Sequence, residues 1–295
     1  MMGGIMRLST LVAVASAFAA APLLAQGGMK ELRTEQAAVP KPTMVARYGP
    51  DDLRSGELRL PQGKGPFPVA VVIHGGCWIA AMDSRAGTTP LAEALRRRGI
   101  AVWNVEYRRL GNPGGGWPGT FEDVAAAVDY VPTLAKTYPL DLNRVTIVGH
   151  SAGAHLALWA ASRGKLAAPF AAGAVKPVSV VAIDGPPVLA PLIGIDAQEC
   201  GQPVIVPLMG GTPVEHPDRY RIATPAENLP LGVRQLLVEA TLGGVMKPYA
   251  DAARVAGDTV EELAPANANH FDIITPGSPN GKAVADWIAT NAFKR

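Results

Sequence analysis

The residues best suited to chemistry lie in the segment Gly149–Gly153, which reads Gly-His-Ser-Ala-Gly. An apolar, β-branched run at 145–148 precedes it and an Ala/Leu-rich run at 154–161 follows it, which predicts a strand and then a helix. A sharp turn between a strand and a helix, flanked by glycines, projects a serine Oγ toward a substrate. The sequence therefore predicts that Ser151 is a nucleophile, and that His150 packs beneath the turn and is not a base.

A second segment, His74–Trp78, could hold the negative charge that such an attack creates. It reads His-Gly-Gly-Cys-Trp and follows another apolar run at 69–73. Small residues at the end of a strand expose backbone N–H groups, and donors aimed at a developing oxyanion stabilise it. We expect these donors to be the N–H groups of Gly76, Cys77 and Ala152. The alternative is a Gly-Gly turn that only closes a strand.

A histidine that could accept the serine proton lies far along the chain. His270 sits in the polar segment 267–272, shortly before an amphipathic helix expected at 282–293. A neutral imidazole is the commonest general base in proteins. The lone His155 is expected on a packed helix face, and His216 in a surface loop.

Together these motifs resemble the α/β-hydrolase superfamily, and specifically its bacterial esterase-like branch related to kynurenine formamidases and hormone-sensitive-lipase-like esterases. The segments 103–109 and 116–123 are also similar to segments that recur in that group. The resemblance implies an α/β fold with a doubly wound, mostly parallel sheet and helices on both faces. It further implies a serine hydrolase that cleaves carboxylic esters through an acyl-enzyme on Ser151, with His270 as general base. Because His-Gly-Gly-x-Trp resembles the kynurenine formamidase motif, an aryl-formamide or small-amide substrate is the alternative.

The sequence departs from the resembled pattern at the acid that should orient the histidine. No aspartate follows the strand expected at 235–238, and the interval to the next helix, expected near 249–256, is short. Such a carboxylate fixes the tautomer of the base and stabilises its charged form. Our first choice is Asp184, which follows the apolar run 178–183 in an Asp-Gly-Pro-Pro turn. Its alternative role is to open that turn.

Two further possibilities remain for the acid. Glu239 lies at the end of the strand where the resembled family carries its aspartate, although it could be only a solvated charge. Asp272 is too close to His270 in sequence to be a comfortable partner. If no carboxylate reaches His270, the chain is a dyad enzyme or a catalytically silent α/β-hydrolase fold that binds a ligand or partner.

The remaining pattern predicts one domain over residues 26–295. Near-continuous apolar runs are typical of buried parallel strands, and helical stretches at 91–98 and 121–134 alternate with them. Residues 186–228, rich in Pro and Gly, are expected to form an excursion over the rim of the site. Trp78 and Trp117 are candidates for lining the pocket or for packing in the core.

The first 25 residues are predicted to be a signal peptide. Arg7 precedes an apolar stretch at 8–21, and a cleavage site is expected between Ala25 and Gln26. The apolar stretch is too short for a confident membrane span. We therefore expect a periplasmic or secreted protein with no stable membrane span after cleavage.

Composition narrows the range of possible substrates, ligands and binding partners. The net charge of +2 over 295 residues and the absence of a phosphate-binding loop favour a small-molecule ester substrate over nucleic acid. No metal-binding spacing of Cys and His is present, and no cofactor is expected. The two cysteines, Cys77 and Cys200, are expected to be free thiols, with a disulfide as the alternative.

Overall fold

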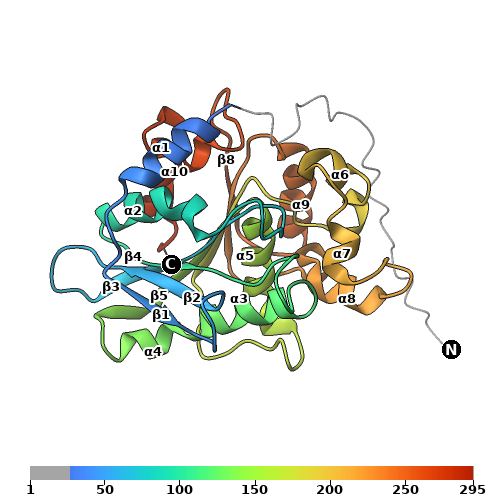
Figure 1. Ribbon diagram of the computed structural model, residues 1–295, viewed down its shortest axis with the longest axis horizontal. Coiled ribbons are helices and arrows are strands. Elements are labelled where there is room, and N and C mark those ends of the chain that lie inside the picture. The colour runs from blue at the N-terminus through green and yellow to red at the C-terminus, as the bar shows by residue number, and fades with distance from the viewer. Residues whose placement is uncertain (1–26, 295) are drawn as a thin grey trace.

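One sheet of eight strands runs through the part of the chain that the computed structural model describes, residues 27–294 (Figure 1). The strand order is β1-β2-β4-β3-β5-β6-β7-β8. The pairs β1–β2 and β2–β4 are antiparallel and the others are parallel. The strands are β1 (Met44–Arg47), β2 (Ser55–Arg59), β3 (Phe67–Ile73), β4 (Ala101–Val105), β5 (Leu140–His150), β6 (Ser179–Ile183), β7 (Arg234–Val238) and β8 (Val260–Leu263).

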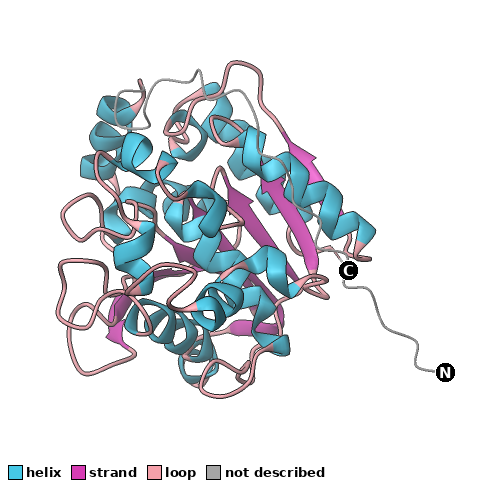
Figure 2. Ribbon diagram, turned by 90° about the vertical axis from the view of Figure 1, so that its right-hand side faces the viewer, coloured by secondary structure: helices cyan, strands magenta, loops and turns pink. Residues whose placement is uncertain are grey.

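Helices cover both faces of this sheet, and Figure 2 shows the strands running through the middle of the molecule with helices around them. One apolar core lies against α1, α2 and α10, and the other against α3, α5 and α9. The helices are α1 (Met29–Ala38), α2 (Thr89–Arg97), α3 (Gly119–Asp129), α4 (Val131–Ala135), α5 (Ala152–Ser162), α6 (Ile195–Cys200), α7 (Ile205–Met209), α8 (Pro217–Ala223), α9 (Gly243–Val255) and α10 (Pro279–Asn291). The prediction of a doubly wound, mostly parallel α/β sheet is confirmed.

Two predicted helices have different limits in the structure. The stretch 121–134 is two helices, α3 and α4, and Pro132 lies in the first turn of α4. Proline lacks an N–H and clashes with the preceding turn, so it starts a helix more readily than it continues one. Helix α9 begins at Gly243, which leaves only residues 239–242 between it and β7. This short connection has no room for an acid-bearing loop.

Residues 186–228 contain the three short helices α6, α7 and α8. In Figure 1 they lie together on the side of the molecule away from α1, α2 and α10. The predicted signal peptide, residues 1–25, lies outside the described residues. Within 27–294, no helix is long and apolar enough to cross a membrane.

The parallel pairing brings the chemically interesting residues to one edge of the sheet. Ile73 pairs with Gly149, and Ile183 pairs with both His150 and Val238. The residues that follow these strands therefore emerge side by side at their carboxyl ends, where open α/β sheets bind ligands.

The turn from β5 into α5 depends on two glycines that allow backbones to touch. A Cβ at Gly149 would lie 1.9 Å from the carbonyl oxygen of Gly153. A Cβ at Gly153 would lie 2.2 Å from the carbonyl oxygen of Ile73, on the neighbouring strand. These contacts involve main-chain atoms, which cannot move aside as a flexible side chain can.

We expect Gly153→Ala to destabilise the fold by about 3 kcal/mol, because the added methyl group overlaps the β3 main chain. The shift of the urea unfolding midpoint measures this loss. Gly164→Ala is the matched control, since a Cβ there meets no atom within 4 Å. A Gly153→Ala midpoint equal to that of the control would contradict the close approach.

Candidate active site

Ser151 sits at the sharp turn between β5 and α5. Its φ of 57° and ψ of −124° are sparsely populated values for a residue with a side chain. Hydrogen bonds hold it there, because its N–H donates to the Ile183 carbonyl at 2.9 Å and its carbonyl accepts from the Ala154 N–H at 2.9 Å. The strained geometry and its flanking glycines are those of a nucleophile elbow.

Asp184 follows β6, the strand next to β5, and its side chain is completely buried. Its Oδ2 lies 2.7 Å from His270 Nδ1. The same carboxylate accepts backbone N–H groups of Ala240 at 2.9 Å, Thr241 at 3.1 Å and Leu242 at 2.7 Å. The short connection after β7 thus supplies donors to the acid and does not carry the acid itself.

Charge and hydrogen bonding decide the protonation of Asp184. Burial by itself raises the pKa of this carboxyl group, but the hydrogen bond and charge of His270 and the N–H groups of Leu242 and Ala240 outweigh it. The pKa of Asp184 therefore lies below its usual value, and the group is a carboxylate at neutral pH. An acceptor at His270 Nδ1 keeps the proton of a neutral ring on Nδ1 and leaves Nε2 unprotonated.

His270 is held from a second side by His150, which sequence reasoning placed beneath the turn without a further role. His150 Nε2 donates to the His270 carbonyl oxygen at 2.8 Å, and the two rings are 4.5 Å apart. Burial, and secondarily the charge of His270, lower the pKa of His150 to about 3. His150 is therefore a neutral donor that anchors the main chain of the base.

The other two carboxylates considered for the acid do other things. Asp272 accepts the N–H of Asn269 at 3.0 Å and the side-chain amide of Asn280 at 2.9 Å. Glu239 lies beside Glu262, and burial together with that neighbour raises the pKa of Glu239 to about 7. Among the described contacts, the carboxylate that reaches the His270 ring is that of Asp184.

The loop after β3 runs beside the serine with three successive left-handed residues. Gly76, Cys77 and Trp78 have φ values of 97°, 51° and 56°. Within residues 27–294, the N–H groups of Gly76, Cys77 and Ala152 have no protein acceptor. Ala152 is the first residue of α5, so its N–H also lies at the positive end of the helix dipole.

A buried polar network supports this loop, and sequence reasoning did not predict it. His74 Nε2 donates to Glu106 Oε1 at 2.8 Å, and Arg109 forms a 2.9 Å ion pair with the same oxygen. Tyr107 stacks on His74 and donates its hydroxyl to the His74 carbonyl at 2.8 Å. Burial alone raises the pKa of Glu106, but His74 and Arg109 outweigh it and lower the pKa to about 2. The segment 103–109, noted only as similar to a family segment, is the signal that could have identified this network.

Two pockets meet at Ser151. The first, of about 50 Å³, is largely apolar and is lined by residues that include Leu192, Ile195, Ile205, Leu242 and Val245. The second, of about 80 Å³, is more polar and is lined by residues that include Arg33, Gln36, Asp83, His150 and His270. Ser151, Cys77 and Glu199 line both. The serine therefore lies between an apolar space and a polar one.

The two tryptophans considered for the pocket differ in role. Trp78 is buried and lines the apolar pocket. Trp117 packs against Phe121 and Phe170, with ring centroids 5.1 and 4.9 Å apart, on the core side. His155 lies on the buried face of α5 as predicted, and its Nε2 donates to the Ala223 carbonyl.

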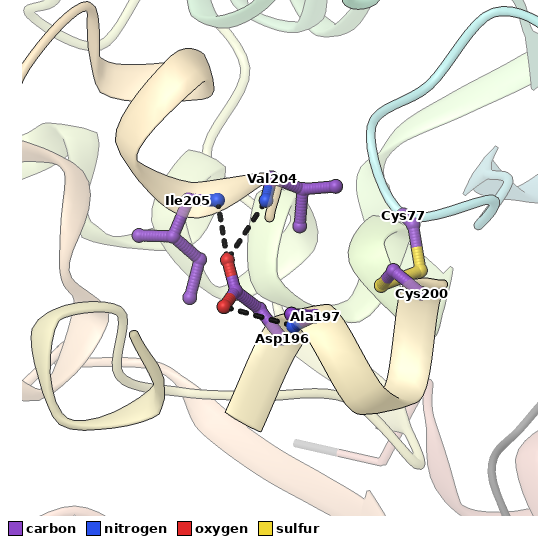
Figure 3. Close-up of a disulfide and its surroundings, with 6 residues drawn as sticks. All are labelled: Cys77, Asp196, Ala197, Cys200, Val204 and Ile205. Atoms are coloured by element: carbon purple, nitrogen blue, oxygen red, sulfur yellow. Dashed lines mark hydrogen bonds between the residues drawn. A yellow bond between two sulfur atoms is a disulfide. The ribbon is translucent and has the colours of Figure 1, made fainter. Parts of the chain in front are cut away.

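The expectation of two free thiols is wrong, because Cys77 and Cys200 form a disulfide (Figure 3). Their Cα atoms are 6.0 Å apart across a sequence separation of 123 residues. Spacing along the chain cannot show this contact, since it is made when α6 folds back over the loop after β3. The bridge ties a residue proposed for the oxyanion hole to the rim of the site.

Comparison with known proteins relates the chain to esterases. The family model named BD-FAE matches residues 57–229. A probable isoprenylcysteine alpha-carbonyl methylesterase of Arabidopsis thaliana is 32% identical over 111 residues, which is 37% of this chain and 22% of that protein. An esterase of Gibberella moniliformis is 29% identical over 135 residues, or 44% of this chain and 41% of that protein. The chain thus spans a minor part of the length of the curated relatives it matches.

Solved structures share the fold over most of the chain. A tributyrin-phosphonate complex of esterase B from Lactobacillus rhamnosis matches with a TM-score of 0.70 at 16% identity, covering 88% of this chain and 89% of that one. A truncated carbohydrate esterase from gut microbiota matches with a TM-score of 0.67 at 19% identity, covering 86% and 98%. The fold is that of the α/β-hydrolase esterases.

The buried His150 makes stability depend on pH. In the unfolded chain it binds a proton as pH falls through 6.5, whereas in the folded protein it stays neutral down to about pH 3. Between these pH values the unfolded state binds more protons than the folded state. The contribution of His150 to the free energy of unfolding is therefore complete above pH 6.5 and is lost as pH falls toward 3.

When the pH is lowered from 7 to 5, we therefore expect the free energy of unfolding to fall by about 2 kcal/mol less in His150→Gln, which keeps a donor, than in wild type. Urea unfolding at the two pH values measures the difference. His155→Gln should act in the same direction, because burial lowers the pKa of His155 to about 4. Equal pH dependence in His150→Gln and wild type would contradict a neutral His150.

Proposed function

The chain belongs to the BD-FAE family, and we propose that it is a secreted serine hydrolase that cleaves carboxylic esters through an acyl-enzyme on Ser151. The observation that carries the proposal is the 2.7 Å hydrogen bond between His270 Nδ1 and Asp184 Oδ2. It supports an oriented base for the serine, and it weakens the alternative of a catalytically silent fold. The esterase names of the relatives are consistent with this activity.

The proposed reaction begins when the unprotonated Nε2 of His270 takes the proton of Ser151 as its Oγ attacks the ester carbonyl carbon. The carbonyl oxygen becomes an oxyanion, which the N–H groups of Gly76, Cys77 and Ala152 receive. His270 then gives its proton to the leaving alcohol as the carbon–oxygen bond breaks. Water, activated by the same ring, attacks the acyl-enzyme and releases the acid and the serine.

Asp184 stabilises the transition state in two ways under this proposal. As a carboxylate it holds the His270 tautomer that leaves Nε2 free to accept a proton. When His270 becomes positively charged, the buried negative charge lies one hydrogen bond away, at low local dielectric. Its three backbone donors keep the carboxylate in place during both steps.

The two pockets can be assigned to the two halves of the ester. The leaving oxygen must lie within reach of the ring that protonates it, and His270 lines the polar pocket but not the apolar one. We infer that the alcohol part occupies the polar pocket and the acyl chain the apolar one. Arg33 and Gln36, on α1, would then face the alcohol.

Kinetics of p-nitrophenyl esters test the proposal. We expect Ser151→Ala to abolish turnover and Asp184→Asn to lower kcat by about 10⁴, because the amide favours the wrong histidine tautomer. Glu239→Gln is the matched control, a carboxylate-to-amide change that leaves the His270 contact intact, and it should stay within a few-fold of wild type.

The outcomes separate the alternatives. Turnover of esters that survives Ser151→Ala would overturn the nucleophile. A larger loss of kcat with Glu239→Gln than with Asp184→Asn would show that the acid is Glu239, directly after β7. No ester turnover, but serine-dependent cleavage of an aryl-formamide, would replace the ester by an amide substrate.

Export is a separate part of the proposal, and the disulfide supports it because such bonds persist in oxidising compartments. In a bacterial host, the full chain should be found in the periplasm or medium with Gln26 as its first residue. Cell fractionation followed by N-terminal sequencing checks this. An uncleaved chain retained in the cytoplasm would contradict it.

A further inference from the structure

We propose that the Cys77–Cys200 disulfide and Asp196 act together to fix α6 as the wall of the acyl pocket, and so restrict the enzyme to short acyl chains. The inference rests on the proposed ester hydrolysis and adds a substrate class and the residues that determine it. It does not follow from the family motifs alone, because Asp196 and Cys200 lie on a rim helix outside them, although Cys77 lies within one.

Helix α6 has little that could hold it in place by itself. It is six residues long, from Ile195 to Cys200, and isolated helices of this length are not stable in water. Its first turn and its last residue are nevertheless both fixed, by the two ties that Figure 3 shows. Its position is therefore set by these ties and by its apolar contacts.

Asp196 makes the tie at the start of α6. Its buried carboxylate accepts four backbone N–H groups, two on each oxygen. The donors are Gly194 at 2.8 Å and Ala197 at 3.0 Å on Oδ1, and Val204 and Ile205 at 2.8 Å on Oδ2. One carboxylate thus joins the beginning of α6 to the beginning of α7, and Ile205 lines the apolar pocket.

Cys200 makes the tie at the end of α6. Its partner Cys77 belongs to the loop after β3 and has the left-handed φ of 51°. Both cysteines are buried and both line the apolar pocket. The bridge therefore holds α6 at a fixed distance from the proposed oxyanion donors. It also restrains Cys77 in a backbone conformation that residues with a side chain rarely adopt.

The apolar pocket that α6 borders is small and partly open to solvent. Its volume is about 50 Å³, and a water-sized position takes roughly 10–15 Å³ on this measure, which allows roughly four such positions. The walls are largely apolar, with Leu192 and Ile195 from the segment 186–228 and Leu242 and Val245 from the segment after β7. On this proposal, acyl groups from acetyl to butanoyl occupy this space, and longer ones need α6 to move.

The acyl-length dependence of kcat/KM follows from this size. Each methylene that the pocket accommodates should raise kcat/KM about fourfold. With the bridge intact, the rise should stop at butanoyl and reverse at hexanoyl. With α6 released, hexanoyl and octanoyl esters should continue the rise, while acetyl and butanoyl esters lose rate as the oxyanion loop relaxes.

The test compares p-nitrophenyl acetate, butanoate, hexanoate and octanoate on the oxidised full chain, on the chain treated with a phosphine reductant, and on the Cys77→Ser/Cys200→Ser variant. The hexanoate-to-butanoate ratio of kcat/KM should rise at least about tenfold when the bridge is opened by either route. Reductant added to the double variant is the matched control and should change nothing. An unchanged ratio in the reduced enzyme would overturn the inference.

Two further variants keep the inference testable if the double variant does not fold. Asp196→Asn leaves the disulfide in place but puts an amide against four N–H donors, and it should shift the ratio toward longer chains. Val245→Ala enlarges the pocket at a lining residue on α9, away from both ties, and should shift the ratio likewise. If only Val245→Ala shifts the ratio, the acyl chain lies in this pocket, but the disulfide and Asp196 do not limit its length. Absence of turnover with every ester would instead overturn the proposed function.

Discussion

The hydrogen bond between Asp184 and His270 is the interaction on which the rest of the site depends. A buried carboxylate is costly unless it is paired and hydrogen-bonded, and Asp184 meets this requirement with one imidazole and three backbone N–H groups. This arrangement also requires an unfavourable backbone conformation at Asp184, whose φ of 44° lies in the left-handed region. The carboxylate, the short connection after β7 and the His270 loop therefore have to be assembled together.

The parallel sheet makes that assembly possible. Strands β3, β5 and β6 are neighbours, so the loop with the proposed oxyanion donors, the serine turn and the acid leave the sheet next to one another. The acid comes from β6 and its N–H donors come from the residues after β7, the adjacent strand. The base arrives from a distant part of the chain and is fixed both by Asp184 and by His150, the residue immediately before the serine. Nucleophile and base are thus positioned by the same strand end.

Much of this arrangement could be predicted from the sequence, because the signals were local. Near-continuous apolar runs indicated buried parallel strands, and the glycines around Ser151 indicated the turn. Asp184 could be singled out because it directly follows such a run, and the structure has it hydrogen-bonded to His270. The trimmed interval after residue 238 carried information as well: helix α9 begins so early that its preceding N–H groups reach the acid on β6.

What could not be predicted were contacts between segments far apart in the chain. The disulfide joins residues 123 positions apart, and no spacing rule says that α6 folds over the loop after β3. The hydrogen bond from His150 to the His270 main chain and the pairing of His74 with Glu106 are hidden for the same reason. Each depends on which side of a turn a side chain takes, and that is settled by tertiary packing.

The most direct test of the central claim is the ¹⁵N NMR spectrum of His270 in histidine-labelled protein, assigned by its loss in His270→Gln. If Asp184 orients the base, the neutral ring carries its proton on Nδ1 and leaves Nε2 unprotonated in wild type, and this preference is lost in Asp184→Asn. A wild-type ring that carries its proton on Nε2 would contradict the account, because His270 could not then accept the proton of Ser151.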